Sequence, residues 1–147
     1  MIYSMLKLGY DCDNVEIKDL LNKVFKSVEI TNADPDDDIG YNDYVVFTTI
    51  DDEVYVMMHS QDCCETVYLE SVDNDTTVLV GSQILVAEVR TNSKKQLNGS
   101  ETWTFYLLGT NEGCCNFRWY GSSNGYYSES VNLYKIMDKS MLQRKEN

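Results

Sequence analysis

The apolar residues of this chain follow two different spacings. Between Val15 and Val24 they stand at positions 15, 17, 20, 21 and 24. This spacing predicts a short amphipathic helix, with Asn14 as its N-cap. Elsewhere, short runs of β-branched, aromatic and other apolar residues are separated by turn residues, which is typical of strands. The first half contains four such runs, at 25–30, 44–50, 54–59 and 65–72, and the middle two form a hairpin around the turn 51–53.

The second half repeats this order of elements. Segment 79–89 parallels 20–30 at an offset of 59 residues, and the hairpin 103–119 parallels the first hairpin at the same offset. This alignment makes Val56 and Cys115 equivalent and predicts that both face the core. Segment 128–133 parallels 64–69 at an offset of 64, because five extra residues fall in the loop 121–125. Insertions are easily accommodated in such loops.

These patterns predict an α+β fold that is mainly antiparallel β. A unit of one short helix and four strands cannot bury its sheet face alone. We therefore expect two such units, 15–72 and 75–135, to pack against each other as an internal duplication. Residues 1–147 then form a single domain, with a flexible C-terminal tail at 136–147.

The charge of the chain is strongly acidic and unevenly distributed. There are 24 Asp and Glu against 12 Lys and Arg, which gives a net charge of −12. Between Thr31 and Val89 there are fourteen acidic residues and no Lys or Arg. A field of one sign repels nucleic acid and anionic lipid, and it attracts basic protein surfaces. We therefore expect a basic protein partner, no direct nucleic-acid binding and no membrane association. The alternative is that the charge serves solubility alone.

Two clusters of acidic residues are candidates for partner binding. One consists of Asp36, Asp37 and Asp38, and the other, residues 51–53, lies in the predicted hairpin turn. The members of the second cluster are Asp51, Asp52 and Glu53. Segment 34–40 faintly resembles a calcium loop, but it has no Glu at the twelfth position and its glycine stands at position seven instead of six. A solvated acidic loop is the better interpretation of that segment.

The only histidine of the chain lies close to a pair of adjacent cysteines. His59 precedes Cys63 and Cys64 by four and five residues. Imidazole and thiolate are preferred ligands of zinc. The hairpin alignment places Cys114 on the strand face that carries His59, so we expect a structural zinc held by these four side chains. Neighbouring cysteines rarely bond to each other. The alternative is that the thiols are inert and fill the core, because free cysteine is often buried.

No convincing catalytic set is present, so we do not expect an enzyme. A cysteine nucleophile paired with His59 needs a positively charged environment. The stretch around His59 is acidic instead, and carboxylates raise the pKa of a nearby thiol. The glycine-rich phosphate-binding motifs and the nucleophile elbow are also missing from the sequence.

One loop of the second half is rich in glycine and tyrosine. It runs from Tyr120 to Tyr127 and reads YGSSNGYY. Aromatic rings give large contact areas at low entropic cost, so loops of this kind are common on binding surfaces. The alternative is a surface loop whose tyrosines pack onto the sheet.

Three blocks of the sequence form a distinctive set. They are HSQDCCE at 59–65, WTFY at 103–106 and RWYGSSNGYYSESV at 118–131. Together they resemble a family of small phage and prophage proteins that is known only as a domain of unknown function, over roughly Val15 to Leu133. The chain departs from the family pattern at Ser60, and also at Cys114 and Cys115, where the family has no cysteines. Zinc ligation by Cys114 would then be specific to this protein.

A looser resemblance is to phage-encoded anti-CRISPR inhibitors of type II-A systems, which are small and acidic. It implies a protein that acts in the cytoplasm of the bacterial host, and the N-terminal residues show no signal-peptide pattern. The implied partner is the basic, PAM-recognising surface of an RNA-guided nuclease, which the protein would block by DNA mimicry.

Two alternatives remain open beside the inhibitor. One is an acidic phage protein with an unrelated binding role. The other is a sponge that sequesters a nucleotide immune signal. A sponge needs basic side chains in an aromatic pocket, and only Arg90 and Arg118 lie near the aromatic segments. This scarcity argues against the sponge.

Overall fold

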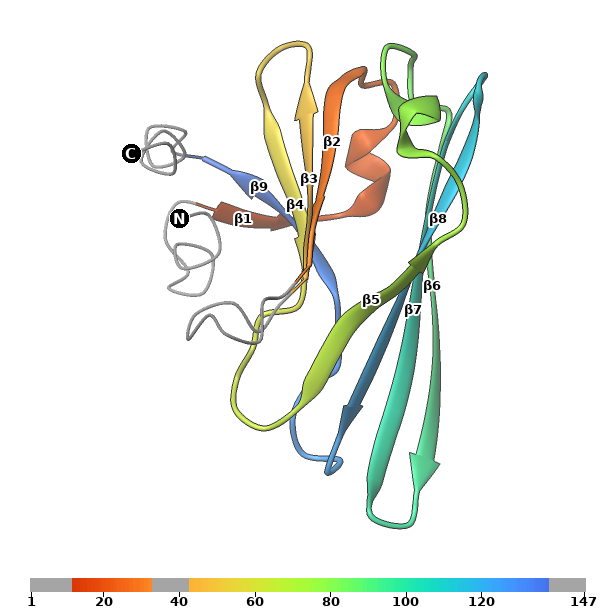
Figure 1. Cartoon of the computed structure of the whole chain (residues 1–147). Coiled ribbons are helices and arrows are strands. Elements are labelled where there is room, and N and C mark those ends of the chain that lie inside the picture. The colour runs from red at the N-terminus through yellow and green to blue at the C-terminus, as the bar shows by residue number, and fades with distance from the viewer. Residues whose placement is uncertain (1–11, 33–42, 138–147) are drawn as a thin grey trace.

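The strands of the protein pair antiparallel throughout and form two sheets. The computed structural model describes residues 12–32 and 43–137. The strand order is β1-β9-β4-β3-β2 in the first sheet and β5-β8-β7-β6 in the second. The two sheets face each other in Figure 1. The strand bounds are β1 Cys12–Val15, β2 Phe25–Thr31, β3 Tyr44–Thr49, β4 Val54–Met58, β5 Thr66–Val72, β6 Val86–Gln96, β7 Gly99–Thr110, β8 Gly113–Ser123 and β9 Asn132–Ile136.

The predicted helix at 15–24 does not form, and the α+β class is wrong. Residues 12–15 instead pair with β9 as strand β1. A single 3-10 turn, η1 (Ile17–Leu20), is enough to bury its two apolar residues, which lie three positions apart. So short a segment gains little from continuing as an α-helix, because the first turn of a helix is costly to form.

The remaining helical element is equally short. It is a second 3-10 turn, η2 (Thr76–Leu79), and the Asp75 side chain caps it by accepting a hydrogen bond from the Thr77 N–H at 3.0 Å. No helix within residues 12–32 and 43–137 is long and apolar enough to cross a membrane. The described chain is thus a two-sheet antiparallel β fold.

The core lies between the facing sheets, and strand alternation decides which side chains enter it. On β4, Tyr55 and Met57 belong to this core. Their neighbours on the same strand point to the other face of the first sheet and form a second apolar cluster there, together with Val46 and Ile136. Because both faces of β3 and β4 are buried, these strands read as continuous apolar runs without alternation.

The prediction that Val56 and Cys115 are equivalent and face inward is half right. Cys115 lies in the core between the sheets, as expected. Val56 lies on the opposite face of its sheet. The two hairpins differ in their turns, with four residues between β3 and β4 and two between β7 and β8. The inward positions of β4 and β8 therefore do not keep in step at an offset of 59.

The two halves share one order of elements but do not pack as separate units. Each has a 3-10 turn followed by four strands, β2 to β5 and then β6 to β9. However, β5 pairs with β8, and β9 pairs with β4. Each half therefore gives its last strand to the sheet of the other half. The crossing strand covers an edge that would otherwise present unpaired backbone groups.

The junction between the halves is reciprocal at the predicted offset. Asn22 donates its backbone N–H to the carbonyl of Ile84 at 2.8 Å, and Gly81 donates its N–H to the carbonyl of Phe25 at 2.9 Å. These two bonds exchange when 59 is added to or subtracted from each residue number. Asn22 and Gly81 also share a left-handed backbone, with φ of 70° and 85°. Asparagine and glycine adopt this conformation most easily.

The expected tail at 136–147 begins one residue too early. Ile136 ends β9 and is buried, with 7% of its surface exposed. Positions 138–147 lie outside the described residues.

We predict that Gly81→Val destabilises the protein by about 1–2 kcal/mol, because a β-branched residue resists a left-handed backbone. No atom lies within 4 Å of a Cβ added at this position, so the effect comes from the backbone alone. Gly81→Asn is the matched control and should cost much less, as Asn22 indicates. Urea unfolding measures both changes, and equal losses would contradict this explanation.

Candidate functional site

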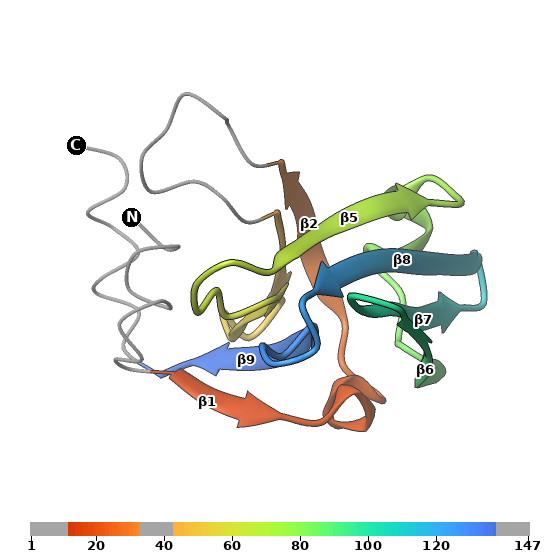
Figure 2. The ribbon, with the colours of Figure 1, turned by 90° about the horizontal axis from the view of Figure 1, so that it is seen from below.

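Both strand exchanges occur at the same end of the molecule. Loop 59–65 leads from β4 in the first sheet to β5 in the second, and loop 124–131 leads back from β8 to β9. Met58 pairs with Asn132 and Thr66 with Ser122, so the two loops cross side by side. Figure 2 views the molecule from this side. We call the surface formed by these two loops and the β6–β7 turn at 97–98 the loop end.

His59 lies at the centre of this crossing and joins the two loops. Its side chain is almost fully buried, with 1% exposed. Nδ1 lies 2.6 Å from the carbonyl oxygen of Ser130, and Nε2 lies 2.8 Å from Oε2 of Glu65. A carbonyl oxygen and an ionised carboxylate only accept hydrogen bonds. Both ring nitrogens therefore donate, and the imidazole is held as a buried cation.

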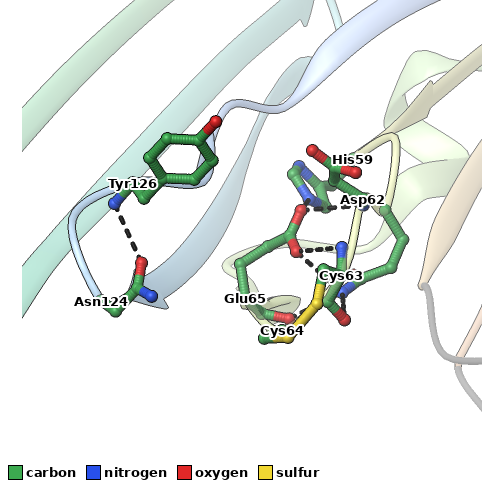
Figure 3. Close-up of a disulfide and its surroundings, with 8 residues drawn as sticks. His59, Asp62, Cys63, Cys64, Glu65, Asn124 and Tyr126 are labelled. Atoms are coloured by element: carbon green, nitrogen blue, oxygen red, sulfur yellow. Dashed lines mark hydrogen bonds and ion pairs between the residues drawn. A yellow bond between two sulfur atoms is a disulfide. The ribbon is translucent and has the colours of Figure 1, made fainter.

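Glu65 is the counter-ion of His59 and also shapes its own loop. Its carboxylate accepts hydrogen bonds from the backbone N–H groups of Asp62 and Cys63, both at 2.9 Å, and from the side-chain amide of Gln61 at 3.2 Å. Figure 3 shows these groups converging on the carboxylate. Burial raises the pKa of Glu65, but the backbone amides and His59 outweigh it and lower the pKa to about 2. The group is thus ionised at neutral pH.

A second buried carboxylate, Glu129, holds the other loop. It lies 64 residues after Glu65, which is the offset predicted for this segment. It accepts hydrogen bonds from the hydroxyls of Ser100 at 2.5 Å, Thr102 at 2.8 Å and Ser123. Burial raises the pKa of Glu129, while these hydroxyls lower it further, so the pKa falls below its usual value. The loop 124–131 is thereby fixed to the start of β7.

The outward side of these loops carries exposed groups. Asp62, Cys63 and Cys64 are exposed on the first loop. On the second loop, Tyr126 is 83% exposed, and its backbone N–H is held by the Asn124 side chain at 2.9 Å. Leu97, at the neighbouring turn, is 98% exposed. The buried network therefore supports a preformed surface that contains an aromatic ring, an aliphatic side chain and an acidic group.

The structure brings together three of the four predicted zinc ligands, but not in a form that suits zinc. Contrary to expectation, Cys63 and Cys64 are joined by a disulfide. Both nitrogens of His59 are occupied by hydrogen bonds. No group of three or more His, Cys, Asp or Glu side chains within the described part of the chain is arranged to hold a metal. Zinc binding stays a prediction that this geometry does not favour.

The fourth predicted ligand, Cys114, lies at the opposite end of the molecule. It is the second residue of β8, eight residues before Ser122, which pairs with Thr66 beside the first loop. At about 3.3 Å per residue this separation is roughly 26 Å. Its neighbour Cys115 is fully buried in the core, and burial, with Asp73 and Asp75 nearby, raises the pKa of its thiol to about 11. Cys115 therefore fits the alternative of an inert core thiol.

The acidic turn at 51–53 also lies away from the loop end. Lysines neutralise much of its charge: Glu53 contacts Lys23 at 2.8 Å and Lys135 at 2.9 Å, and Asp52 contacts Lys26. Within this cluster, Asp51 is exposed and lies outside these ion pairs. This turn therefore lacks the concentrated negative charge that its sequence suggests. The other cluster, Asp36, Asp37 and Asp38, lies outside the described residues.

The sequence contained signals for the site residues that we did not assign. Glu65 and Gln61 belong to the HSQDCCE block but carried no expected role. Glu129 follows from the offset of 64, which pairs it with Glu65. A glutamate that recurs at equivalent positions of two halves, each time beside a crossing loop, is the pattern that would have indicated the network.

The fold and the site together define a two-sheet antiparallel β protein with a rigid loop end. The family model called domain of unknown function DUF7448 matches residues 12–133. The chain therefore belongs to this family, in agreement with the resemblance to a domain of unknown function. No curated protein and no solved structure matches the chain.

We predict that Glu65→Gln destabilises the protein by on the order of 3 kcal/mol, because it leaves the His59 cation buried without a counter-ion. Glu112→Gln, at the exposed turn between β7 and β8, should change stability little. Chemical denaturation at neutral pH measures both changes. Equal stability of the two variants would show that the buried pair does not hold the loops.

The same carboxylate makes stability depend on pH in a defined window. Its pKa is about 2 in the folded protein and 4.5 ordinarily, so the unfolded chain takes up the proton first. The stabilising contribution is complete above about pH 4.5 and is lost as the pH falls towards 2. Denaturation at a series of pH values should show a steeper loss for the native protein than for Glu65→Gln. Parallel curves would contradict this assignment.

The disulfide predicts how many thiols react. The chain has five cysteines, of which Cys12, Cys114 and Cys115 are free. The unfolded, unreduced protein should therefore label at three thiols, and the reduced protein at five. A Cys63→Ser, Cys64→Ser double variant should give three in both states. Five reactive thiols before reduction would contradict the disulfide and would make the zinc site worth testing again.

Proposed function

We propose that this protein is a non-catalytic binding protein that holds a basic protein partner against its loop end. The observation that carries the proposal is the buried network of His59, Glu65 and Glu129, which fixes two crossing loops whose outer sides are exposed. Loops on a rigid β scaffold are common sites of recognition. Preorganised loops lose little conformational entropy when they bind, and this favours affinity.

The exposed groups of the loop end suit a protein surface. Tyr126 and Tyr127 pack edge to face with ring centroids 5.0 Å apart, and Leu97 lies on the adjacent turn. Aromatic residues are enriched at the centres of protein interfaces. The net charge of −12 then favours a basic partner, because long-range attraction raises the rate of encounter.

The partner class that we propose is the lysine- and arginine-rich DNA-binding surface of an RNA-guided nuclease. The support for this class is the acidic charge together with the resemblance to phage inhibitors. In this form of the proposal, Asp62 at the loop end takes one of the arginine contacts that DNA would otherwise receive. The lysine-paired turn at 51–53 contributes mainly to the long-range field.

Binding is favoured over catalysis by the state of the reactive side chains. His59, the only histidine, is 1% exposed and both its nitrogens are hydrogen-bonded. It is therefore poorly placed to exchange protons with a substrate. Cys63 and Cys64 are joined to each other, and Cys115 is buried.

We predict that Asp62→Lys weakens binding to a purified type II nuclease by more than about tenfold, since contacts between desolvated charges are worth a few kcal/mol. Asp51→Lys is the matched control. It makes the same change of charge at an exposed position outside the loop end and should alter mainly the salt-dependent association rate. Tyr126→Ala should also weaken binding by about tenfold, through the dissociation rate. Association and dissociation rates at low and high salt measure these effects.

Two outcomes would overturn this proposal. If Asp51→Lys and Asp62→Lys weaken binding equally, only the overall charge matters and the loop end is not the interface. If no variant changes the binding or inhibition of a DNA-handling protein, the partner class is wrong.

A further inference from the structure

The outer face of the second sheet carries a row of aromatic rings. Trp103 pairs directly with Tyr120, and Tyr120 pairs with Tyr68, on three neighbouring strands. The ring centroids are 5.3 Å and 5.6 Å apart. Tyr68 is 41% exposed, and both other rings are partly exposed. A row of aromatic rings that faces away from the core offers faces on which a flat ligand can stack.

The next row of the same face carries two arginines. Arg90 pairs with Phe105, and Phe105 pairs with Arg118, so one guanidinium stands on each side of the ring. Arg118 lies 5.7 Å from the ring centroid and also contacts Glu70 at 3.2 Å. Arg90 makes no ion pair with any residue that the structure describes. These are two of the three arginines in a chain of net charge −12, so their meeting at one ring is unusual.

A groove of about 460 Å³ lies beside this row. Its volume falls in the range of small-molecule sites. Phe105 and Leu107 form its apolar part, and its polar side chains include Glu88, Arg90 and Asn116. The side-chain oxygen of Asn116 is buried and has no hydrogen-bond partner among the described residues. A buried acceptor of this kind is costly unless a ligand or water satisfies it.

We propose that this groove binds a mononucleotide. The base stacks on the aromatic rings around Phe105 and Trp103, and the phosphate is held by Arg90 and Arg118. Glu88 accepts hydrogen bonds from the ribose hydroxyls, and the Asn116 amide pairs with the edge of the base. A nucleic-acid polymer fits less well, because the overall acidic field repels a long chain of phosphates. A single nucleotide needs only the local pair of arginines.

The structure removes the objection that the sequence raised against nucleotide binding. Arg90 and Arg118 are 28 residues apart in the chain and looked too few to form a phosphate site. Sheet pairing brings them to the two sides of one ring. The inference does not rest on the loop end, which lies at one end of the sandwich and not on this face.

The test is a titration of the purified full-length protein with AMP, GMP, CMP and UMP. Trp103 is the outward-facing tryptophan, and Trp119 is 1% exposed, so stacking should quench the fluorescence of Trp103. Calorimetry gives the affinity independently of fluorescence. Nucleosides without phosphate should bind about tenfold or more weakly, because they lose the charged hydrogen bonds. Inorganic phosphate alone should not quench.

Arg90→Ala and Phe105→Ala should each lower the affinity by about tenfold or more. Lys95→Ala is the matched control for charge, since Lys95 lies on the same strand but at a position that points to the other face. It should leave the affinity unchanged, and so should Tyr126→Ala at the loop end. If no nucleotide is bound in the calorimeter, or if Arg90→Ala binds as tightly as Lys95→Ala, the proposal is wrong.

Discussion

The buried pair of His59 and Glu65 is the interaction on which the arrangement of the molecule depends. It stands where the chain crosses between the sheets in both directions, and it contacts both crossing loops. Glu65 receives hydrogen bonds from two backbone amides in addition to His59. A buried charge is tolerated only when it is paired and hydrogen-bonded in this way. Loss of either partner would leave an uncompensated charge at the one place where the two sheets exchange strands.

The strand exchange explains why one end of the molecule is better ordered than its turn-rich sequence suggests. Had each half kept its own last strand, loops 59–65 and 124–131 would belong to separate sheets. Exchange instead makes them neighbours, and the two equivalent glutamates, Glu65 and Glu129, then fix one loop each. The same pairing builds the second sheet from both halves. Its outer face therefore combines Tyr68 from the first half with Trp103, Phe105 and the arginines from the second.

Charge and shape act at different ranges in this protein. The excess of acidic residues gives the whole chain a negative field, yet the acidic turn at 51–53 is largely paired with lysines. The field can favour basic partners at a distance, whereas close contacts depend on the exposed aromatic and aliphatic groups. The arginine pair on the second sheet is a local exception, because two fixed guanidinium groups can hold one phosphate despite the surrounding charge.

The sequence by itself determined the strands, both hairpins, the inward position of Cys115 and the repeated order of elements, because these follow from local alternation and turn residues. The short helix failed because the spacing at 15–24 suits one 3-10 turn beside an edge strand equally well. Only the tertiary structure decided the exchange of β5 and β9, the disulfide, the distance of Cys114 from His59 and the meeting of Arg90 with Arg118. These features depend on which strands pair, and pairing between residues far apart in the chain is set by packing of the whole molecule and not by any local pattern.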